Sequence, residues 1–339
     1  MSRFVIGIDI GGSGSRAALG AVAADQEAPR TCPRVLDTFI GPRLEVGSGG
    51  STVLDVVRGL VDSAATAWAA HLPEVMGIGI GASGIASLSD GPAEVPAEIS
   101  ADFDIPAVAA IDAVTAHLGA LDGRGGAITV LGTGAIAIGH PGPGEHGHWA
   151  ADWSRVDGWG HLFGDRGGGA WLGRLGLELA LRAHDGVDDC GSVLLEAAIR
   201  RFGLPDSWPG LFYTRSDRAG LLAEFATDIA EAARTGDAAS AQLLDGAGRE
   251  AARSALAAAR PALLRSVESA GAAAVRIALT GGLAAAGGHL VEGFGAESSR
   301  LRPDAAIVDP AGGPLDGALM LAHLGAGGKL SAQERVLWI

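Results

Sequence analysis

Three glycine-rich segments could bind phosphate groups through their main chain. They follow strand-like apolar runs and read Gly11-Gly-Ser-Gly-Ser15, Gly132-Thr-Gly134 and Thr280-Gly-Gly282. A turn without bulky side chains lets backbone N–H groups approach an anion closely. One such turn is weak support for a nucleotide site, because ordinary tight turns have the same composition. Three of them in one chain favour a nucleotide held between two lobes.

Two aspartates could complete a site for phosphoryl transfer. Asp9 precedes the first glycine segment, where it could hold Mg²⁺ through water while Ser13 contacts the phosphates. Asp112 follows a short apolar run and opens a helix, and there it could take the proton of a hydroxyl nucleophile. Taken alone, each has a plainer interpretation: a surface carboxylate at a turn for Asp9, and a helix N-cap for Asp112.

Composition excludes several classes of protein. The chain of 339 residues has a net charge of −14 without long like-charge runs, which argues against nucleic acid or an anionic membrane as a partner. Lys329 is the only lysine and precedes Leu330, so neither a Walker A loop nor a Schiff-base lysine is expected. Cys32 and Cys190 are far apart, which excludes a disulfide framework and a Cys-rich metal cage within one subunit.

We also expect no targeting signal in this sequence. The N-terminus passes from Arg3 into Phe4-Val-Ile-Gly-Ile-Asp9, which is too short and too acidic for a signal peptide. No apolar stretch reaches the roughly 20 residues of a membrane span. We therefore expect a cytoplasmic protein.

Strands and helices alternate along the chain in a way that predicts an α/β fold with a cleft. A hairpin over 127–139 weakly resembles the first one, which hints at an internal duplication. Residues 140–166, rich in Gly, His and Trp, are predicted to form a loop. The expected strands are 3–9, 15–24, 34–40, 75–80, 106–111 and 275–279, and the expected helices 52–72, 112–121, 167–184, 218–235, 237 to about 269 with a break near Pro261, 288–294 and 315–324.

The order of these motifs resembles the BadF/BadG/BcrA/BcrD ATPase family, and within it the N-acetylglucosamine kinase and glucosamine kinase branch. The resemblance covers nearly the whole chain, and its most specific part is Asp157-Gly-Trp-Gly-His-Leu-Phe-Gly-Asp165. It implies two ribonuclease H-like lobes of the actin/hexokinase/Hsp70 type around an ATP cleft. The N-terminal lobe would be 1–115 plus 315–339 and the C-terminal lobe 116–314. The resemblance also implies a homodimer, which is common in this family.

The resemblance implies ATP-dependent phosphorylation of an amino sugar, N-acetylglucosamine or glucosamine, at a primary hydroxyl to give the 6-phosphate. Asp112 would be the catalytic base and Asp9 the Mg²⁺ carboxylate. Main-chain amides, rather than a cationic side chain, would grip the triphosphate. The ATP-binding residues would be Gly11, Gly12, Ser13, Gly14, Ser15, Gly132, Thr133, Gly134, Thr280, Gly281 and Gly282. The sugar-binding residues would be Ser83, Gly84, Asp112, Trp159, Gly160 and Asp165.

The chain departs from the family pattern at several positions. Ser13-Gly-Ser15 replaces the frequent Thr-Lys-Thr, which keeps the hydroxyl but removes the charge. Arg166 replaces the usual Glu after Gly-Asp, and Gly168 replaces a Ser. Leu44 and Glu45 stand in a stretch that carries a sugar-contacting Asn in related kinases. Recognition of the acetyl group is therefore an open question, and Glu45 could favour an unacetylated amine.

Two other functions stay open on the sequence. One is an ATPase that activates a dehydratase, which needs cysteines from two subunits around an iron–sulfur cluster; Cys32 and Cys190 lack the Gly-rich context for it. The other is a non-catalytic nucleotide-binding regulator, against which the presence of both Asp112 and Asp165 argues. The clustered His146, His148 and His161 lack a regular ligand spacing, so solvated loop histidines are favoured over a metal site.

Overall fold

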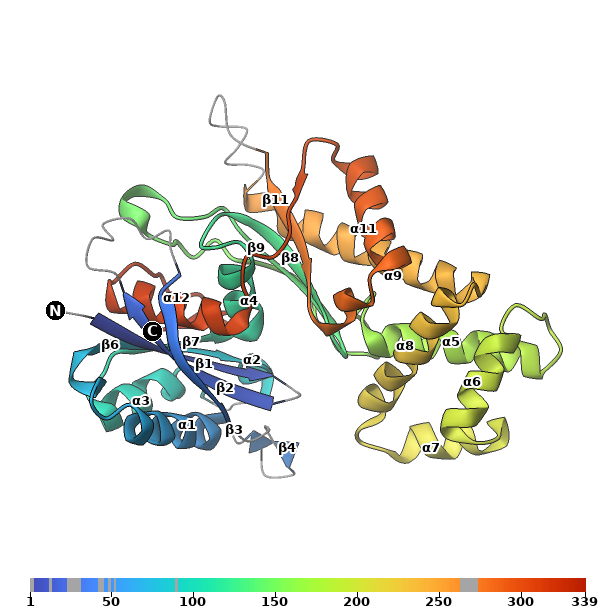
Figure 1. The fold of residues 1–339 in the computed structure, drawn as a ribbon, viewed down its shortest axis with the longest axis horizontal. Coiled ribbons are helices and arrows are strands. Elements are labelled where there is room, and N and C mark those ends of the chain that lie inside the picture. The colour runs from blue at the N-terminus through green and yellow to red at the C-terminus, as the bar shows by residue number, and fades with distance from the viewer. Residues whose placement is uncertain are drawn as a thin grey trace.

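The computed structural model describes residues 3–11, 14–22, 32–41, 46–47, 50–51, 53–88, 91–262 and 274–339. Two mixed β-sheets lie side by side with helices around them, and a group of helices extends away from the second sheet (Figure 1). Both ends of the described chain lie near the first sheet (Figure 1). In the described residues, no helix is long and apolar enough to cross a membrane.

The first sheet is built on the predicted N-terminal hairpin. β1 (Arg3–Gly11) and β2 (Gly14–Val22) pair antiparallel in continuous register, and the strand order is β13-β7-β6-β1-β2-β3. β6 and β7 run parallel to β1, so their carboxyl ends meet at one edge. The remaining strands are β3 (Arg34–Gly41), β6 (Val75–Ala82), β7 (Ala107–Ile111) and β13 (Leu337–Trp338), with a separate two-stranded ribbon of β4 (Val46–Gly47) and β5 (Gly50–Ser51).

Helices cover both faces of this sheet, which is why its central strands are almost continuously apolar. α1 (Val53–Ala67) and α3 (Glu94–Phe103) lie on one face, while α4 (Asp112–Ala120) and α12 (Pro314–Ala326) lie on the other (Figure 1). The expected return of the C-terminal helix to the first sheet is observed, since α12 packs on β1 and β6. The short helices are η1 (Leu72–Glu74) and α2 (Ile85–Leu88).

The second sheet repeats the strand plan of the first. Its order is β10-β9-β8-β11-β12, in which β8, β9 and β10 pair antiparallel and β11 and β12 run parallel to β8. The first sheet has the same order and directions in β3-β2-β1-β6-β7. The hint of an internal duplication thus has a counterpart in topology. The strands are β8 (Gly126–Leu131), β9 (Ala135–His140), β10 (Ser154–Asp157), β11 (Arg276–Thr280) and β12 (Ala306–Ile307).

The outer face of the second sheet packs against α9, and the remaining helices build outward from there (Figure 1). Their interior is a second hydrophobic cluster, distinct from that of the first sheet. These helices are α5 (Gly169–His184), α6 (Ser192–Phe202), α7 (Trp208–Thr214), α8 (Arg218–Arg234), α9 (Ala238–Ala258) and α11 (Gly288–Leu301), with 3₁₀ turns η2 (Glu145–Gly147), η3 (Pro205–Ser207) and η4 (Gly282–Ala286).

Helix α4 lies between the two sheets and is buried on all sides from Ala113 to Ala120. Its contact with α12 is exceptionally close, because a Cβ at Gly317 would lie 1.7 Å from the Thr115 carbonyl oxygen. One hydrophobic cluster therefore runs from the first sheet through α4 to the inner face of the second. The position of α4 fixes Asp112, its first residue.

An aromatic cluster and the C-terminal segment join the two halves. Trp149 and Trp153 stack with ring centroids 5.6 Å apart, and His117 meets Trp153 edge-on at 5.1 Å. Burial lowers the pKa of His117 to about 3. The backbone of Trp149 pairs with that of Leu330, and the Gln333 side chain exchanges two 2.9 Å hydrogen bonds with the Trp153 backbone.

Some elements differ from the sequence-based expectations. The region 140–166 is not all loop, since β10 lies within it; its four residues Ser154-Arg-Val-Asp157 are too few and too polar to show a strand pattern. Neither α3 nor α6 was predicted, and both are short. α9 ends at Ala258, in line with the break expected near Pro261, and the end expected near 269 lies outside the described residues.

Candidate active site

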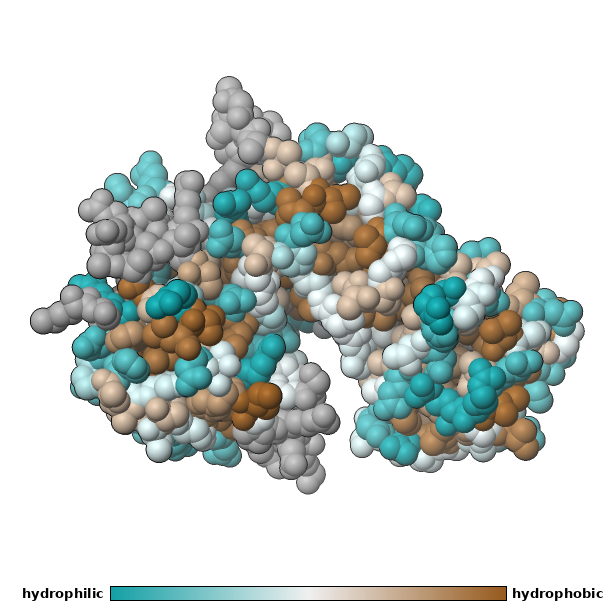
Figure 2. Space-filling view, viewed as in Figure 1, coloured by the Kyte–Doolittle hydropathy of each residue, from teal (hydrophilic) through white to brown (hydrophobic). Residues whose placement is uncertain are grey.

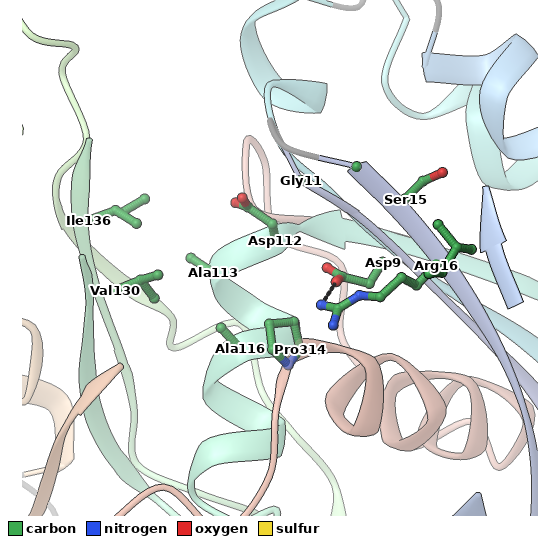
Figure 3. Close-up of a pocket in the computed structure, with 12 residues that line it drawn as sticks. Asp9, Gly11, Ser15, Arg16, Asp112, Ala113, Ala116, Val130, Ile136 and Pro314 are labelled. Atoms are coloured by element: carbon green, nitrogen blue, oxygen red, sulfur yellow. Dashed lines mark hydrogen bonds and ion pairs between the residues drawn. The ribbon is translucent and has the colours of Figure 1, made fainter. Parts of the chain in front are cut away.

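The two topologically equivalent hairpins face a pocket of about 440 Å³ (Figure 3). Gly11 and Gly14 of the β1–β2 hairpin line it on one side, and Val130 and Ile136 of the β8–β9 hairpin on the other. Asp112 at the start of α4 also lines it. The other lining residues are Asp9, Ser15, Arg16, Ile40, Ala113, Ala116 and Pro314. The space-filling view shows the molecule hollowed between its two halves (Figure 2).

Asp9 lies near the end of β1 and is 6% exposed. Arg16 stands directly opposite it in the antiparallel ladder, and the guanidinium Nη2 donates to the Asp9 carboxylate at 2.5 Å (Figure 3). Arg16 was not among the expected site residues. The hairpin register could have identified it. With Gly14 opposite Gly11, each following residue pairs with the one before in the first strand, so Arg16 comes opposite Asp9.

Asp112 directly follows β7, and its pKa is raised to about 6. Burial is the main cause, and the negative charge of Asp9 is the second. Hydrogen bonds from the Ala113 amide and the Ser83 hydroxyl oppose the rise. The N-cap position belongs to Ile111, which makes no side-chain capping bond. The arrangement suits a carboxylate that exchanges a proton near neutral pH.

Ser83 reaches Asp112 because of strand register. Ala82 at the end of β6 pairs with Ile111 at the end of β7, so the next residues, Ser83 and Asp112, emerge side by side. The Ser83 amide donates to the Ile10 carbonyl at 2.8 Å, which fixes the turn after β6. Gly84 follows with a positive φ of 74°, where a glycine is favoured.

A second pocket, of about 1130 Å³, lies beyond the β8–β9 hairpin. Gly132 and Thr133 at the tip of that hairpin line it, together with Gly282 after β11. The hairpin therefore stands between the two pockets, with Val130 and Ile136 toward the first one. Helices α8 and α9, η4 and the start of α11 supply most of the remaining wall: Ala223, Glu224, Ala226, Thr227, Ala230, Glu231, Ala233, Arg234, Leu244, Leu283, Ala286, Gly287, Gly288 and His289.

Thr280 and Gly281 do not line either pocket but position the turn that does. Gly281 has a φ of 97°, and a Cβ there would lie 2.2 Å from the Leu131 carbonyl oxygen. A larger residue would push this turn away from the β8–β9 hairpin. Thr280 pairs with Val130 in the parallel ladder, and its hydroxyl is buried without a partner among the described residues.

Asp165 connects the Gly-Trp-Gly loop, residues 158–165, to the β8–β9 hairpin. Its carboxylate accepts hydrogen bonds from the amides of Gly160 and Ala135. A Cβ at Gly134 would lie 2.4 Å from the Asp165 carboxylate, so glycine is required for this approach. Burial raises the pKa of Asp165, although the two amide bonds oppose that rise. Asp165, Gly160 and Trp159 do not line either pocket, and the Trp159 side chain is 66% exposed, within 5.3 Å of the Arg155 guanidinium.

Asp157 is a structural residue that sequence reasoning did not single out. It is buried with a positive φ of 64°, and its carboxylate accepts from the amides of Asp165 (2.8 Å) and Arg166 (2.9 Å). These two hydrogen bonds join the beginning of the Gly-Trp-Gly loop to its end. The Arg166 guanidinium lies 3.8 Å from the same carboxylate and is half exposed.

Among its described residues, the site has no preformed set of metal ligands. No group of three or more His, Cys, Asp or Glu residues suited to a metal occurs in the parts of the chain that the structure describes. His148 instead makes a 2.9 Å hydrogen bond to Ser331. The Asp9 carboxylate at the pocket fits Mg²⁺, which keeps several waters, binds through one or two carboxylates and uses substrate phosphates as ligands. Gly12, Ser13, Leu44 and Glu45 lie outside the described residues.

Comparisons with known proteins agree with this architecture. The profile of the BadF/BadG/BcrA/BcrD ATPase family matches residues 6–322. An N-acetylmuramic acid/N-acetylglucosamine kinase of Clostridium acetobutylicum is 28% identical over 183 residues, which is 54% of this chain and 55% of that protein. The match thus spans about half the length of this curated relative.

Solved structures are similar over almost the whole chain. A candidate N-acetylglucosamine kinase of Chromobacterium violaceum has a TM-score of 0.65 at 25% identity, covering 94% of this chain and 98% of its own. A ROK family glucokinase of Streptomyces griseus, solved with glucose and AMPPNP, has a TM-score of 0.55 at 21% identity and covers 95% and 98%. These likenesses confirm the expected two-lobed α/β fold of actin-like sugar kinases.

Proposed function

The chain belongs to the BadF/BadG/BcrA/BcrD ATPase family, and on that premise we propose that it phosphorylates an amino sugar with ATP. The substrate would be N-acetylglucosamine or glucosamine, and the product the 6-phosphate. The observation that carries the proposal is that Asp9 and Asp112 line one pocket, next to a glycine hairpin that opens onto a second pocket.

The two pockets suggest how a nucleotide would lie. The base and ribose fit the larger pocket beside Gly282, and the phosphates would pass the tip at Gly132 and Thr133 toward Asp9. Such a path leads the terminal phosphate to the pocket that contains Asp112. Gly11, Gly14 and Ser15 would surround it from the first hairpin.

Asp9 is the residue that would hold Mg²⁺, through water. When bound, the ion would neutralise charge on the β- and γ-phosphate oxygens. The Asp9 carboxylate faces the pocket and its present partner is the half-exposed Arg16, so no buried network has to break for it to act.

Asp112 would act as the base. Its ionised carboxylate accepts the proton of the sugar hydroxyl while the hydroxyl oxygen attacks the γ-phosphorus, and the bond from phosphorus to the β–γ bridging oxygen breaks. The Ser83 hydroxyl donates to the same carboxylate and would keep it oriented. A pKa of about 6 leaves the base ionised at pH 7 yet able to take a proton.

The sugar would lie between Asp112 and the loop of Trp159, Gly160 and Asp165. The Asp165 carboxylate already accepts hydrogen bonds from two backbone amides. Its two oxygens can accept further hydrogen bonds from sugar hydroxyls. Its link to Gly134 would couple sugar contacts to the phosphate hairpin. On this proposal, the first lobe comprises 1–115 plus 315–339 and the second 116–314, and the enzyme works as a homodimer.

Release of ADP, coupled to a spectroscopic assay, tests the proposal. With ATP and Mg²⁺ we expect turnover with N-acetylglucosamine or glucosamine, weak turnover with glucose, and none with the 6-deoxy sugar. N-Acetylmuramate belongs in the same panel because of the Clostridium relative. An absence of sugar-stimulated ADP release across the panel would overturn the proposal.

The dehydratase-activator alternative has less support in the described residues. The Cys32 thiol donates to the Asp316 carbonyl at 3.1 Å, and burial with nearby carboxylates raises its pKa to about 12. A thiol that resists ionisation is a poor iron–sulfur ligand. Measurement of iron in the purified protein separates the two functions, since a sugar kinase of this kind needs none.

A further inference from the structure

We propose that Arg16 supplies a cation that binds the terminal phosphates of the nucleotide, which revises the expectation that main-chain amides, rather than a cationic side chain, grip the triphosphate. The inference rests on the proposed function. It starts from the composition of the first pocket, where two carboxylates, Asp9 and Asp112, receive a polyanionic substrate. Without a local cation, the empty pocket would repel the triphosphate until Mg²⁺ arrives.

Position favours Arg16 for this role. It lines the pocket together with Asp9, and cross-strand register places it on the same face of the hairpin (Figure 3). Lys329, the one lysine of the sequence, is elsewhere: its carbonyl oxygen accepts from the Trp149 amide in the C-terminal segment. Arg155 lies in β10 and Arg166 directly follows Asp165, and neither lines either pocket.

The contacts of Arg16 leave it free to change partner. Only Nη2 of its guanidinium donates to a described residue, and the side chain is 52% exposed. A guanidinium has five donors in a planar fork that matches two phosphate oxygens. With Mg²⁺ held at Asp9, that carboxylate would attract Arg16 less strongly, and the phosphate oxygens would be the strongest acceptors near the guanidinium. The ion pair with Asp9 thus holds the Arg16 guanidinium at the pocket where the phosphates would bind.

Calorimetric titration of the intact protein tests this without turnover. In Mg²⁺, Arg16→Met should weaken binding of AMPPNP by about tenfold to a hundredfold, the range of a charged hydrogen-bond pair. AMP, which lacks the terminal phosphates, should bind within about twofold of wild type. Arg16→Lys should recover most of the AMPPNP affinity. The matched control is Arg58→Met, which removes an arginine paired with Glu98 and Asp102 outside both pockets and should change neither titration.

Two outcomes overturn the inference. If Arg16→Met binds AMPPNP as tightly as wild type, or more tightly, Arg16 is only the counterion of Asp9. If AMP and AMPPNP weaken equally, the variant has disturbed the whole cleft. Should the Met variant lose its native circular dichroism spectrum, the same titration of Arg16→Gln decides. Failure of the proposed function is distinguishable, since it would show as wild-type protein that releases no ADP with any sugar.

Discussion

The negative charge of Asp9 raises the pKa of Asp112 across the first pocket, on top of the larger effect of burial. The two carboxylates come from β1 and from the start of α4, about a hundred residues apart in sequence. Their coupling means that a cation bound near Asp9 also lowers the pKa of Asp112. In the loaded cleft, Asp112 should therefore stay ionised to a lower pH than in the free enzyme.

The pKa of Asp112 predicts the acidic limit of activity. Below pH 6 the carboxyl of the free enzyme is protonated and cannot accept the hydroxyl proton, so kcat/KM should fall about tenfold per pH unit. A pH profile of ADP release from pH 4.5 to 8.5 measures this, with circular dichroism at each pH as the control for folding. A flat profile down to pH 5 would contradict the assignment.

Asp112→Asn should separate activity from stability. Turnover should drop by about a hundredfold to ten-thousandfold, the usual contribution of a general base. A carboxyl whose folded pKa lies above its unfolded value of 3.8 destabilises the fold progressively as pH rises from 3.8 through 6, and fully above. The variant should therefore be more stable than wild type at pH 7.5, by on the order of 3 kcal/mol, and this gain should vanish near pH 4.

Thermal melts at both pH values check that prediction. The matched control is Asp55→Asn, which neutralises an exposed carboxylate in the first turn of α1. It should leave kcat unchanged and show no such gain. Wild-type kcat in Asp112→Asn would remove Asp112 from the mechanism.

Gly317→Val should damage the site from a distance. Its Cβ would lie 1.7 Å from the Thr115 carbonyl oxygen, so α4 and α12 must separate. We expect a loss of at least about 2 kcal/mol in the free energy of unfolding, and reduced kcat because Asp112 moves with α4. Gly59→Ala is the control: the added methyl at this exposed position of α1 meets nothing within 4 Å and should stabilise the fold by about 0.5–1 kcal/mol. Equal stability of the two variants would show that the helix contact can relax.

Asp157→Ala should act mainly on the sugar side. It removes the acceptor for the amides of Asp165 and Arg166, so the Gly-Trp-Gly loop loses its fixed ends. KM for the sugar should rise about tenfold while KM for ATP stays within about twofold. The control, Asp206→Ala, truncates an exposed carboxylate in η3 and should alter neither constant. A rise in KM for ATP alone would place the loop at the nucleotide.

The strand and helix frame around the site is the part that sequence patterns predict well. Asp9, Ser83 and Asp112 each follow or end a strongly apolar strand, and the strands they follow are neighbours in the sheet. The parallel arrangement alone brings their carboxyl ends together. The first hairpin and α4 are found within a few residues of their expected limits.

What the sequence hides depends on contacts between distant segments. Arg16 becomes a site residue only through hairpin register, and Asp157 only through the amides that its carboxylate meets eight and nine residues later. Strand β10 is held by its pairing with β9 rather than by its own composition. The larger pocket is walled mainly by helices whose amphipathic pattern gives no sign of a ligand.

The C-terminal segment has a mechanical consequence. Leu337 and Trp338 pair with β7 of the first sheet, while Ser331 and Gln333 hold the segment that follows β9 of the second. The two halves cannot slide apart there without breaking these bonds. Any swing of one half against the other that keeps these bonds must carry the segment after β9 along with the C-terminal segment.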